Sequence, residues 1–410
     1  GKVNNLFGSS NLSGDVSTSN VVVSSGIGEN IYGGNNIGGT TNISNVNING
    51  GEINNVYGGG RETDINTSSN VNIMGSATNV FGGSDKSGNV KTSYISVNDG
   101  VVTNIYGGNN LGGKTTTSNV TVNGGIIGSL YGGGLEAFTT TSNLNVLYGK
   151  VDYLFGGGKS AGVNDTHLNL NKGYIKNTYG GSNVLGDVIN TNIKNTNLEL
   201  ESNSDLYADV TFDKSTVNQT NNQNIKSSEN IKVTLHNNSN VSYNDWDFYL
   251  ITTDSVFDSN WSSTNIEEIN GVFHANQVNQ WYGTNALSSY STLSFDFNIH
   301  SYVSYDDFFV IGYVLIGHNS NSDDVKTVYY NDLYVTNMYG GNNEGGVTTN
   351  SNIDLSSGTY GTVYGGGNKA VINKSNVNVV NATILNSIYG GGNAASVLTD
   401  TSLNVLDKTT

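Results

Sequence analysis

Residues 44–57 have the sequence SNVNINGGEINNVY, and this pattern returns along most of the chain. It ends in an aliphatic residue and an aromatic residue followed by glycine, as in Val56, Tyr57 and Gly58. The aromatic residue recurs every 24 or 25 residues, first at Phe7. A fixed period of this length predicts a solenoid made of one repeated unit. The later aromatic positions, which we expect to stack, are Tyr32, Tyr57, Phe81, Tyr106, Tyr131, Phe155, Tyr179, Tyr339, Tyr364 and Tyr389.

Each unit also contains an alternating stretch that indicates a β-strand. Val46 and Ile48 alternate with polar residues, which places one face of the strand inward. Frequent glycine pairs and the absence of a 3.6-residue period argue against helix. A single coil cannot bury its apolar face, whereas coils stacked about 4.8 Å apart share a continuous core. We therefore predict an all-β fold: a parallel β-solenoid with about eight coils in residues 1–200 and about three in 331–410.

The sequence leaves the direction of the aromatic side chains open. Strict alternation would place Tyr57 on the same face as Ile53, with Val56 on the other face. A bend at Asn55 would instead place Ile53 and Val56 inside and turn Tyr57 outward. Rings inside would belong to the core, whereas rings outside would form an apolar stripe suited to sugar contact or to packing between rods.

An asparagine frequently lies two residues before the aromatic position. In stacked coils these side chains would align, and their amides could hydrogen-bond from coil to coil. A ligand-binding role for the same row is the alternative. The expected asparagine ladder contains Asn30, Asn55, Asn79, Asn104 and Asn177.

The repeat resembles the β-strand-repeat proteins of bacterial cell surfaces, whose units have the form V-Y-G-G-G-N followed by an alternating strand. Residues 363–368 have the sequence VYGGGN, and residues 44–57 fit the rest of the unit equally well. The resemblance covers roughly residues 1–200 and 331–410. It implies a parallel β-solenoid that is secreted or displayed on a cell surface, often adhesin-like, with no standard catalytic residues to carry over.

Residues 201–330 interrupt the period. This segment holds 16 acidic residues against 4 lysines, and alternating stretches such as 231–235 and 293–299. We expect an inserted all-β module of the sandwich type, with a degenerate coil near Leu206. A carbohydrate-binding platform is one hypothesis for its aromatic residues, and burial in the module's core is the other. The tryptophans of this hypothesis are Trp246, Trp261 and Trp281.

Composition argues against several functions. The net charge of −16 makes nucleic acid an unexpected partner, because phosphate binding needs a basic face. No apolar run reaches the length of a membrane-spanning helix, so no membrane insertion is expected. The five histidines show no metal-binding spacing, and the carboxylates fall at different phases of the repeat. We therefore expect no enzyme activity, no metal site and no cofactor. Ca²⁺ bound at the acidic turns 245–247, 306–307 or 321–324 is the alternative.

The two ends of the sequence correspond to the two halves of one coil. Residues 402–410 match the first half of the internal unit 142–156, and residues 1–8 match its second half. Uncapped solenoid ends template further pairing, so we expect self-association end to end. The leading hypothesis is a structural protein of an extracellular surface or fibre. An adhesin whose inserted module binds a glycan or host ligand is the second, and a polysaccharide-active enzyme or phage-tail component is the third.

Overall fold

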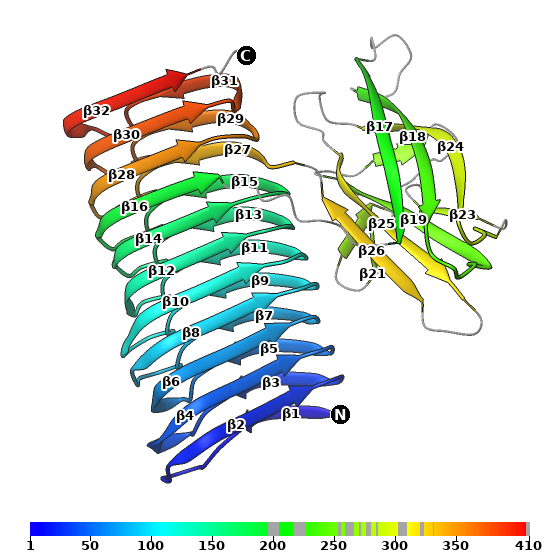
Figure 1. Ribbon diagram of the computed structural model, residues 1–410. Helices are drawn as coiled ribbons and strands as arrows, with labels where there is room; N and C mark the ends of the chain where they lie inside the picture. The colour runs from blue at the N-terminus through cyan, green and yellow to red at the C-terminus, as the bar shows by residue number, and fades with distance from the viewer. Residues whose placement is uncertain are drawn as a thin grey trace. The chain divides into compact units, whose positions relative to one another are not determined.

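Alternating short and long strands build the repeated part of the chain in this computed structural model (Figure 1). The structure describes residues 1–195, 205–216, 227–252, 256–258, 266–269, 272–275, 280–283, 286–301, 310–319, 324–330 and 332–406. Within these ranges every regular element is a β-strand. The chain divides into a unit of Gly1–Leu198 with Asp332–Thr410 and a second unit of Glu199–Asn331.

The solenoid consists of two parallel eleven-stranded sheets, which confirms the predicted fold class. Each coil contributes one strand to each sheet, so neighbours in a sheet come from successive coils. The short-strand sheet contains β1 (Lys2–Phe7), β3 (Ile27–Tyr32), β5 (Glu52–Tyr57), β7 (Ser76–Phe81), β9 (Val101–Tyr106), β11 (Ile126–Tyr131), β13 (Lys150–Phe155), β15 (Tyr174–Tyr179), β27 (Tyr334–Tyr339), β29 (Thr359–Tyr364) and β31 (Thr383–Tyr389). The long-strand sheet contains β2 (Val16–Val23), β4 (Ile37–Ile48), β6 (Glu62–Ile73), β8 (Val90–Val97), β10 (Lys114–Val122), β12 (Phe138–Val146), β14 (Val163–Leu170), β16 (Val188–Asn195), β28 (Thr348–Leu355), β30 (Ile372–Val380) and β32 (Val397–Leu406).

A bend in each short strand resolves the direction of the aromatic residues. Pairing between β3 and β5 joins Gly28 to Ile53 and then Asn30 to Asn55, and passes over Asn54. Ile53 and Val56 both enter the aliphatic core between the sheets. Tyr57 belongs to a separate buried cluster made of rings. The bend alternative therefore holds, but the ring it turns away from the core is covered rather than exposed.

The glycine after the aromatic residue makes room for the next coil and for the opposite sheet. A Cβ atom on Gly58 would lie 2.5 Å from the carbonyl oxygen of Gly82 and 2.8 Å from Val71 Cγ2. Contacts this short are absent from real side chains, so any larger residue would displace both the backbone of the next coil at Gly82 and the opposite sheet at Val71. The recurring aromatic–glycine pair is thus a packing requirement of the coil's corner.

The inserted unit is an antiparallel sandwich, which confirms the expected all-β module. One sheet has the order β17 (Leu206–Thr216), β18 (Ser227–Asn237), β24 (Ser291–Ser301) and β20 (Val256–Asp258). The other has the order β23 (Gln280–Gly283), β19 (Asp245–Thr252), β25 (Val310–His318) and β26 (Val325–Tyr330), and β21 (Ile266–Ile269) pairs with β22 (Val272–Ala275). Residues of both four-stranded sheets share one core, among them Leu206, Ile231, Phe248 and Leu315. The expected degenerate coil near Leu206 is wrong, because β17 pairs antiparallel with β18.

Candidate functional site

The aromatic residues of successive coils stack into one column along the solenoid. Ring centroids of neighbours lie between 4.6 Å, for Phe7 and Tyr32, and 5.0 Å, for Tyr57 and Phe81. Interplanar angles stay at or below 10°. The spacing follows from in-register parallel pairing, which places equivalent residues one strand spacing apart. The structure brings together all the predicted rings: Tyr32, Tyr57, Phe81, Tyr106, Tyr131, Phe155, Tyr179, Tyr339, Tyr364 and Tyr389.

Loop side chains cover the column by reaching hydroxyl groups two coils away. The Tyr32 hydroxyl donates to Asp85 Oδ2 at 3.1 Å, and Asn183 Nδ2 donates to the Tyr131 hydroxyl at 3.1 Å. Burial, followed by the nearby Asp85 carboxylate, raises the pKa of Tyr32 above its ordinary value. The hydroxyl therefore stays protonated and serves as a neutral donor. Leu135 also packs on the column, so the covering row contains apolar as well as polar side chains.

The asparagine ladder lies on the outer face of the short-strand sheet. Asn30, Asn55, Asn79 and Asn104 each donate from Nδ2 to Oδ1 of the preceding coil, at 2.9–3.0 Å. Ser129 and Tyr153 occupy the next two places in the register. The ladder resumes where Asn337 donates to Asn177 at 3.1 Å. Each amide uses one donor and one acceptor in these bonds, so an unbroken run stabilises coil stacking and offers little free polarity to a ligand.

A buried row of hydroxyl groups joins the two sheets and was not found from the sequence. Ser93 Oγ donates to the carbonyl oxygen of Gly107 at 2.5 Å, and Thr166 Oγ1 donates to that of Gly180 at 2.7 Å. Ser44 makes the same contact to Gly58. These carbonyls belong to the glycines that follow the aromatic residues. The available signal is the serine or threonine that precedes the outward asparagine in motifs such as SNV.

Three loops contain a fully buried asparagine that fastens them to the preceding coil. Asn109 Oδ1 accepts from the Ser84 backbone N–H at 2.9 Å and from Thr115 Oγ1 at 3.1 Å. Its Nδ2 donates to the carbonyl oxygens of Gly88 at 2.7 Å and Gly112 at 2.9 Å. All four hydrogen-bonding positions of the amide are filled. Equivalent networks surround Asn35 and Asn342.

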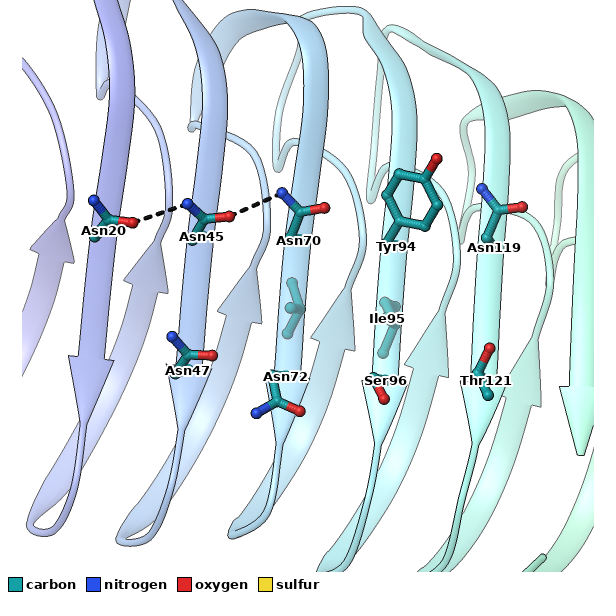
Figure 2. A pocket seen from close by; sticks show the side chains of 11 residues that line it. Asn20, Asn45, Asn47, Asn70, Asn72, Tyr94, Ile95, Ser96, Asn119 and Thr121 are labelled. Carbon is teal, nitrogen blue, oxygen red and sulfur yellow. Dashed lines mark hydrogen bonds between the residues drawn. The ribbon is translucent and has the colours of Figure 1, made fainter. Parts of the chain in front are cut away.

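A groove of about 570 Å³ lies on the outer face of the long-strand sheet (Figure 2). One wall is a row of outward side chains in which Tyr94 follows three asparagines. The other wall is a row two residues further along the same strands, and Val71 and Ile95 lie between them. Most of the lining residues carry an amide or a hydroxyl group. The first row contains Asn20, Asn45, Asn70, Tyr94 and Asn119, and the second contains Asn47, Asn72, Ser96 and Thr121.

The tryptophans of the inserted module occupy different situations. Trp246 is 4% exposed and its ring stacks on Phe295 at a centroid distance of 5.2 Å. It therefore contributes to the sandwich core, and its ring is not available as a surface platform. Trp281 lies on β23, and its side chain falls outside the described part of the structure. Trp261 lies outside the described residues altogether.

His318 bridges two carboxylates in the inserted module. Its Nδ1 lies 2.9 Å from Asp324 Oδ2, and its Nε2 lies 3.2 Å from Asp247 Oδ2. Burial lowers the pKa of His318, but its hydrogen bonds to the carboxylates of Asp247 and Asp324 outweigh that effect and leave the pKa raised. Only part of the acidic turns considered for Ca²⁺ is described by the structure. Residues 245–247 are described, whereas 306–307 and 321–323 lie outside the described residues. Among the described residues, no group of three or more acidic, histidine or cysteine side chains is arranged to hold a metal ion.

Comparison with known protein families, with curated proteins and with solved structures found no match. Within the described part of the chain, no helix has the length and apolar character needed to cross a membrane.

Proposed function

We propose that this chain is a structural protein of an extracellular surface or fibre, in which stacked coils form a filament or part of a longer stalk. One observation carries the proposal: the same contacts repeat from coil to coil. Each coil adds one ring to the column, two strands to parallel sheets and aliphatic residues to one core. Such an array gains stability by nearest-neighbour stacking and needs no site to perform a mechanical role.

The last strand of the long-strand sheet supports end-to-end continuation. Leu403 and Val405 pair with Val377 and Val379, which are buried in the aliphatic core. Leu403 is nevertheless 41% exposed and Val405 61% exposed. A further coil, from a second copy or from a longer chain, would bury this apolar surface and pair the edge strand. The resemblance to bacterial surface repeats supports the extracellular location.

Electron microscopy of the purified chain over a range of concentrations tests the stacking. We expect rods whose length increases with protein concentration. Val405→Asp should shorten them, because it places a charge where the next coil would pack. Leu398→Asp is the matched control, since Leu398 is equally exposed but lies outside the core phase of the same strand. Particles of a single length at every concentration, unchanged by Val405→Asp, would refute end-to-end stacking.

A further inference from the structure

The groove beside Tyr94 has the features of a binding site, and the proposed structural role does not require it. In its first row, Asn45 Nδ2 donates to Asn20 Oδ1 at 2.8 Å. Asn70 Nδ2 donates in turn to Asn45 Oδ1 at 2.9 Å. The next coil supplies Tyr94 in place of an asparagine (Figure 2). The amide chain therefore stops at Asn70.

This interruption leaves unused hydrogen-bonding capacity on both sides of an open ring. Within the described part of the chain, no donor reaches Asn70 Oδ1, because the residue that would provide it is Tyr94. On the far side, Asn119 Oδ1 accepts from Asn143 at 2.9 Å. The Asn119 Nδ2 makes one bond, to the Ser93 carbonyl oxygen at 3.3 Å, so its second N–H is available. Tyr94 itself is 48% exposed.

We propose that this groove binds a neutral glycan, with one sugar ring stacked on Tyr94 and its hydroxyl groups hydrogen-bonded to Asn70 and Asn119. A sugar presents an apolar C–H face and a rim of hydroxyl groups that both donate and accept, which matches an aromatic ring flanked by an amide acceptor and an amide donor. The two walls run from coil to coil, so a linear oligosaccharide would lie across the strands. Asn72 and Ser96, on the opposite wall of the same two coils, would contact the sugar that stacks on Tyr94.

The charge of the groove selects among possible ligands. No ionisable group other than the Tyr94 phenol lines it, and the chain as a whole has a net charge of −16. Nucleic acids and sulfated or uronic glycans need cationic partners that this surface does not provide. A neutral glycan needs only amides, hydroxyls and an aromatic face. None of the tryptophans of the inserted module is among its lining residues.

The repeat itself supplies the best variant for testing this site. Tyr94→Asn restores the residue type found at the same place in β4, β6 and β10, and would reconnect the amide chain without disturbing the core. Tyr153→Asn is the matched control, because Tyr153 interrupts the asparagine ladder of the other sheet and is 43% exposed. Both variants should keep the circular dichroism spectrum of the parent.

Calorimetric titration with neutral oligosaccharides of two to six units, from the glucose, mannose, galactose and N-acetylglucosamine series, measures binding. We expect at least one series to bind, with affinity lost more than tenfold in Tyr94→Asn and unchanged in Tyr153→Asn. Tyr94→Phe should keep most of the affinity, because the ring face is retained. No binding to any series, equal binding by Tyr94→Asn, or loss of binding only in Trp261→Ala or Trp281→Ala would overturn the assignment.

Discussion

Replacing Asn109 by alanine tests whether the buried loop asparagines hold neighbouring coils together. The substitution removes four hydrogen bonds and leaves the Ser84 N–H and the carbonyl oxygens of Gly88 and Gly112 without their amide partner. A typical hydrogen bond contributes about 0.5–1.5 kcal/mol net, and each buried group left unpaired costs about 1–3 kcal/mol. A water molecule entering the vacated polar space would replace some of the lost hydrogen bonds and so restore part of the lost stability. We therefore expect Asn109→Ala to lower the free energy of unfolding by about 3–4 kcal/mol.

Asn109→Asp gives a second, pH-dependent measure of the same contacts. The carboxylate would face two carbonyl oxygens and lose both donors, so the destabilisation at neutral pH should exceed that of alanine. Burial and these acceptors raise the pKa of a carboxyl group in that position. The lost stability should therefore return in part as the pH falls through the raised pKa, because the protonated form can donate again.

Urea unfolding followed by circular dichroism gives the global effect, and hydrogen exchange gives the local one. Local exchange is decisive, because repeat arrays can depart from two-state unfolding. The Ser84 amide should lose protection in Asn109→Ala. Leu111→Ala is the control in the same loop; its side chain is exposed, so its effect should stay within about 0.5 kcal/mol. Equal protection of Ser84 and equal urea midpoints in the two variants would refute the reasoning.

Three further predictions concern the glycine corner, the ring column and the inserted module. Gly107→Ala should destabilise by about 1–3 kcal/mol, because its Cβ would lie 2.3 Å from the Gly132 carbonyl oxygen. The equivalent Gly390→Ala in the last coil, with its nearest atom at 3.4 Å, should be close to neutral when both are compared by urea unfolding. The Tyr106 ring is buried between Phe81 and Tyr131, so Tyr106→Ala should lower the free energy of unfolding by about 3–5 kcal/mol in the same assay. Tyr106→Phe keeps the ring and should cost less than about 1.5 kcal/mol. His318 has a pKa raised above 6.5, so its stabilising contacts are fully present below that pH and are lost as the pH rises through the folded-state pKa. Melting of the module between pH 5 and 9 should show this decline, and His318→Gln should flatten it.

The period in the sequence could predict the features that depend only on phase. In-register stacking forces residues at one phase into one row, so the positions of Tyr57 and Asn55 in the repeat imply a ring column and an amide ladder. Features that join different phases were not predictable in this way. The bond from Thr166 to the Gly180 carbonyl crosses from one sheet to the other and depends on how the corner turns. Burial of Asn109 depends on the backbone path of the preceding loop, which its own repeat does not encode.

The groove beside Tyr94, which we propose as a glycan site, was missed for a related reason. Sequence reasoning sought binding in the inserted module because tryptophans are concentrated there, yet Trp246 is needed to fill the sandwich core. Tyr94 carried a weaker signal, a tyrosine at a phase where most coils have asparagine or another polar residue. Its meaning emerges only when the orientation of the amides on each side is known. In a regular array, a departure from the repeat therefore leaves unused hydrogen-bonding groups that the repeat itself would pair.

The solenoid continues across the insertion because the free-energy cost of closing a loop depends only weakly on the number of residues in the loop. Neighbouring coils normally join residues 25 apart, whereas Asn190 and Asn350, which bond at 2.9 Å, are 160 apart. The logarithmic law makes this longer closure cost only about 1.6 kcal/mol more. The register is re-established by the bond from Asn337 to Asn177 and by the network of the buried Asn342. The stabilisation from these hydrogen bonds is of the same order as this closure cost or larger. Since Asn342 fastens to the Ser182 loop as Asn109 fastens to the Ser84 loop, the coil after the insertion is recognised by the coil before it. A folded module can therefore be inserted between β16 and β27 without altering the stacking, because the hydrogen bonds that join the two coils are made by residues of their own loops.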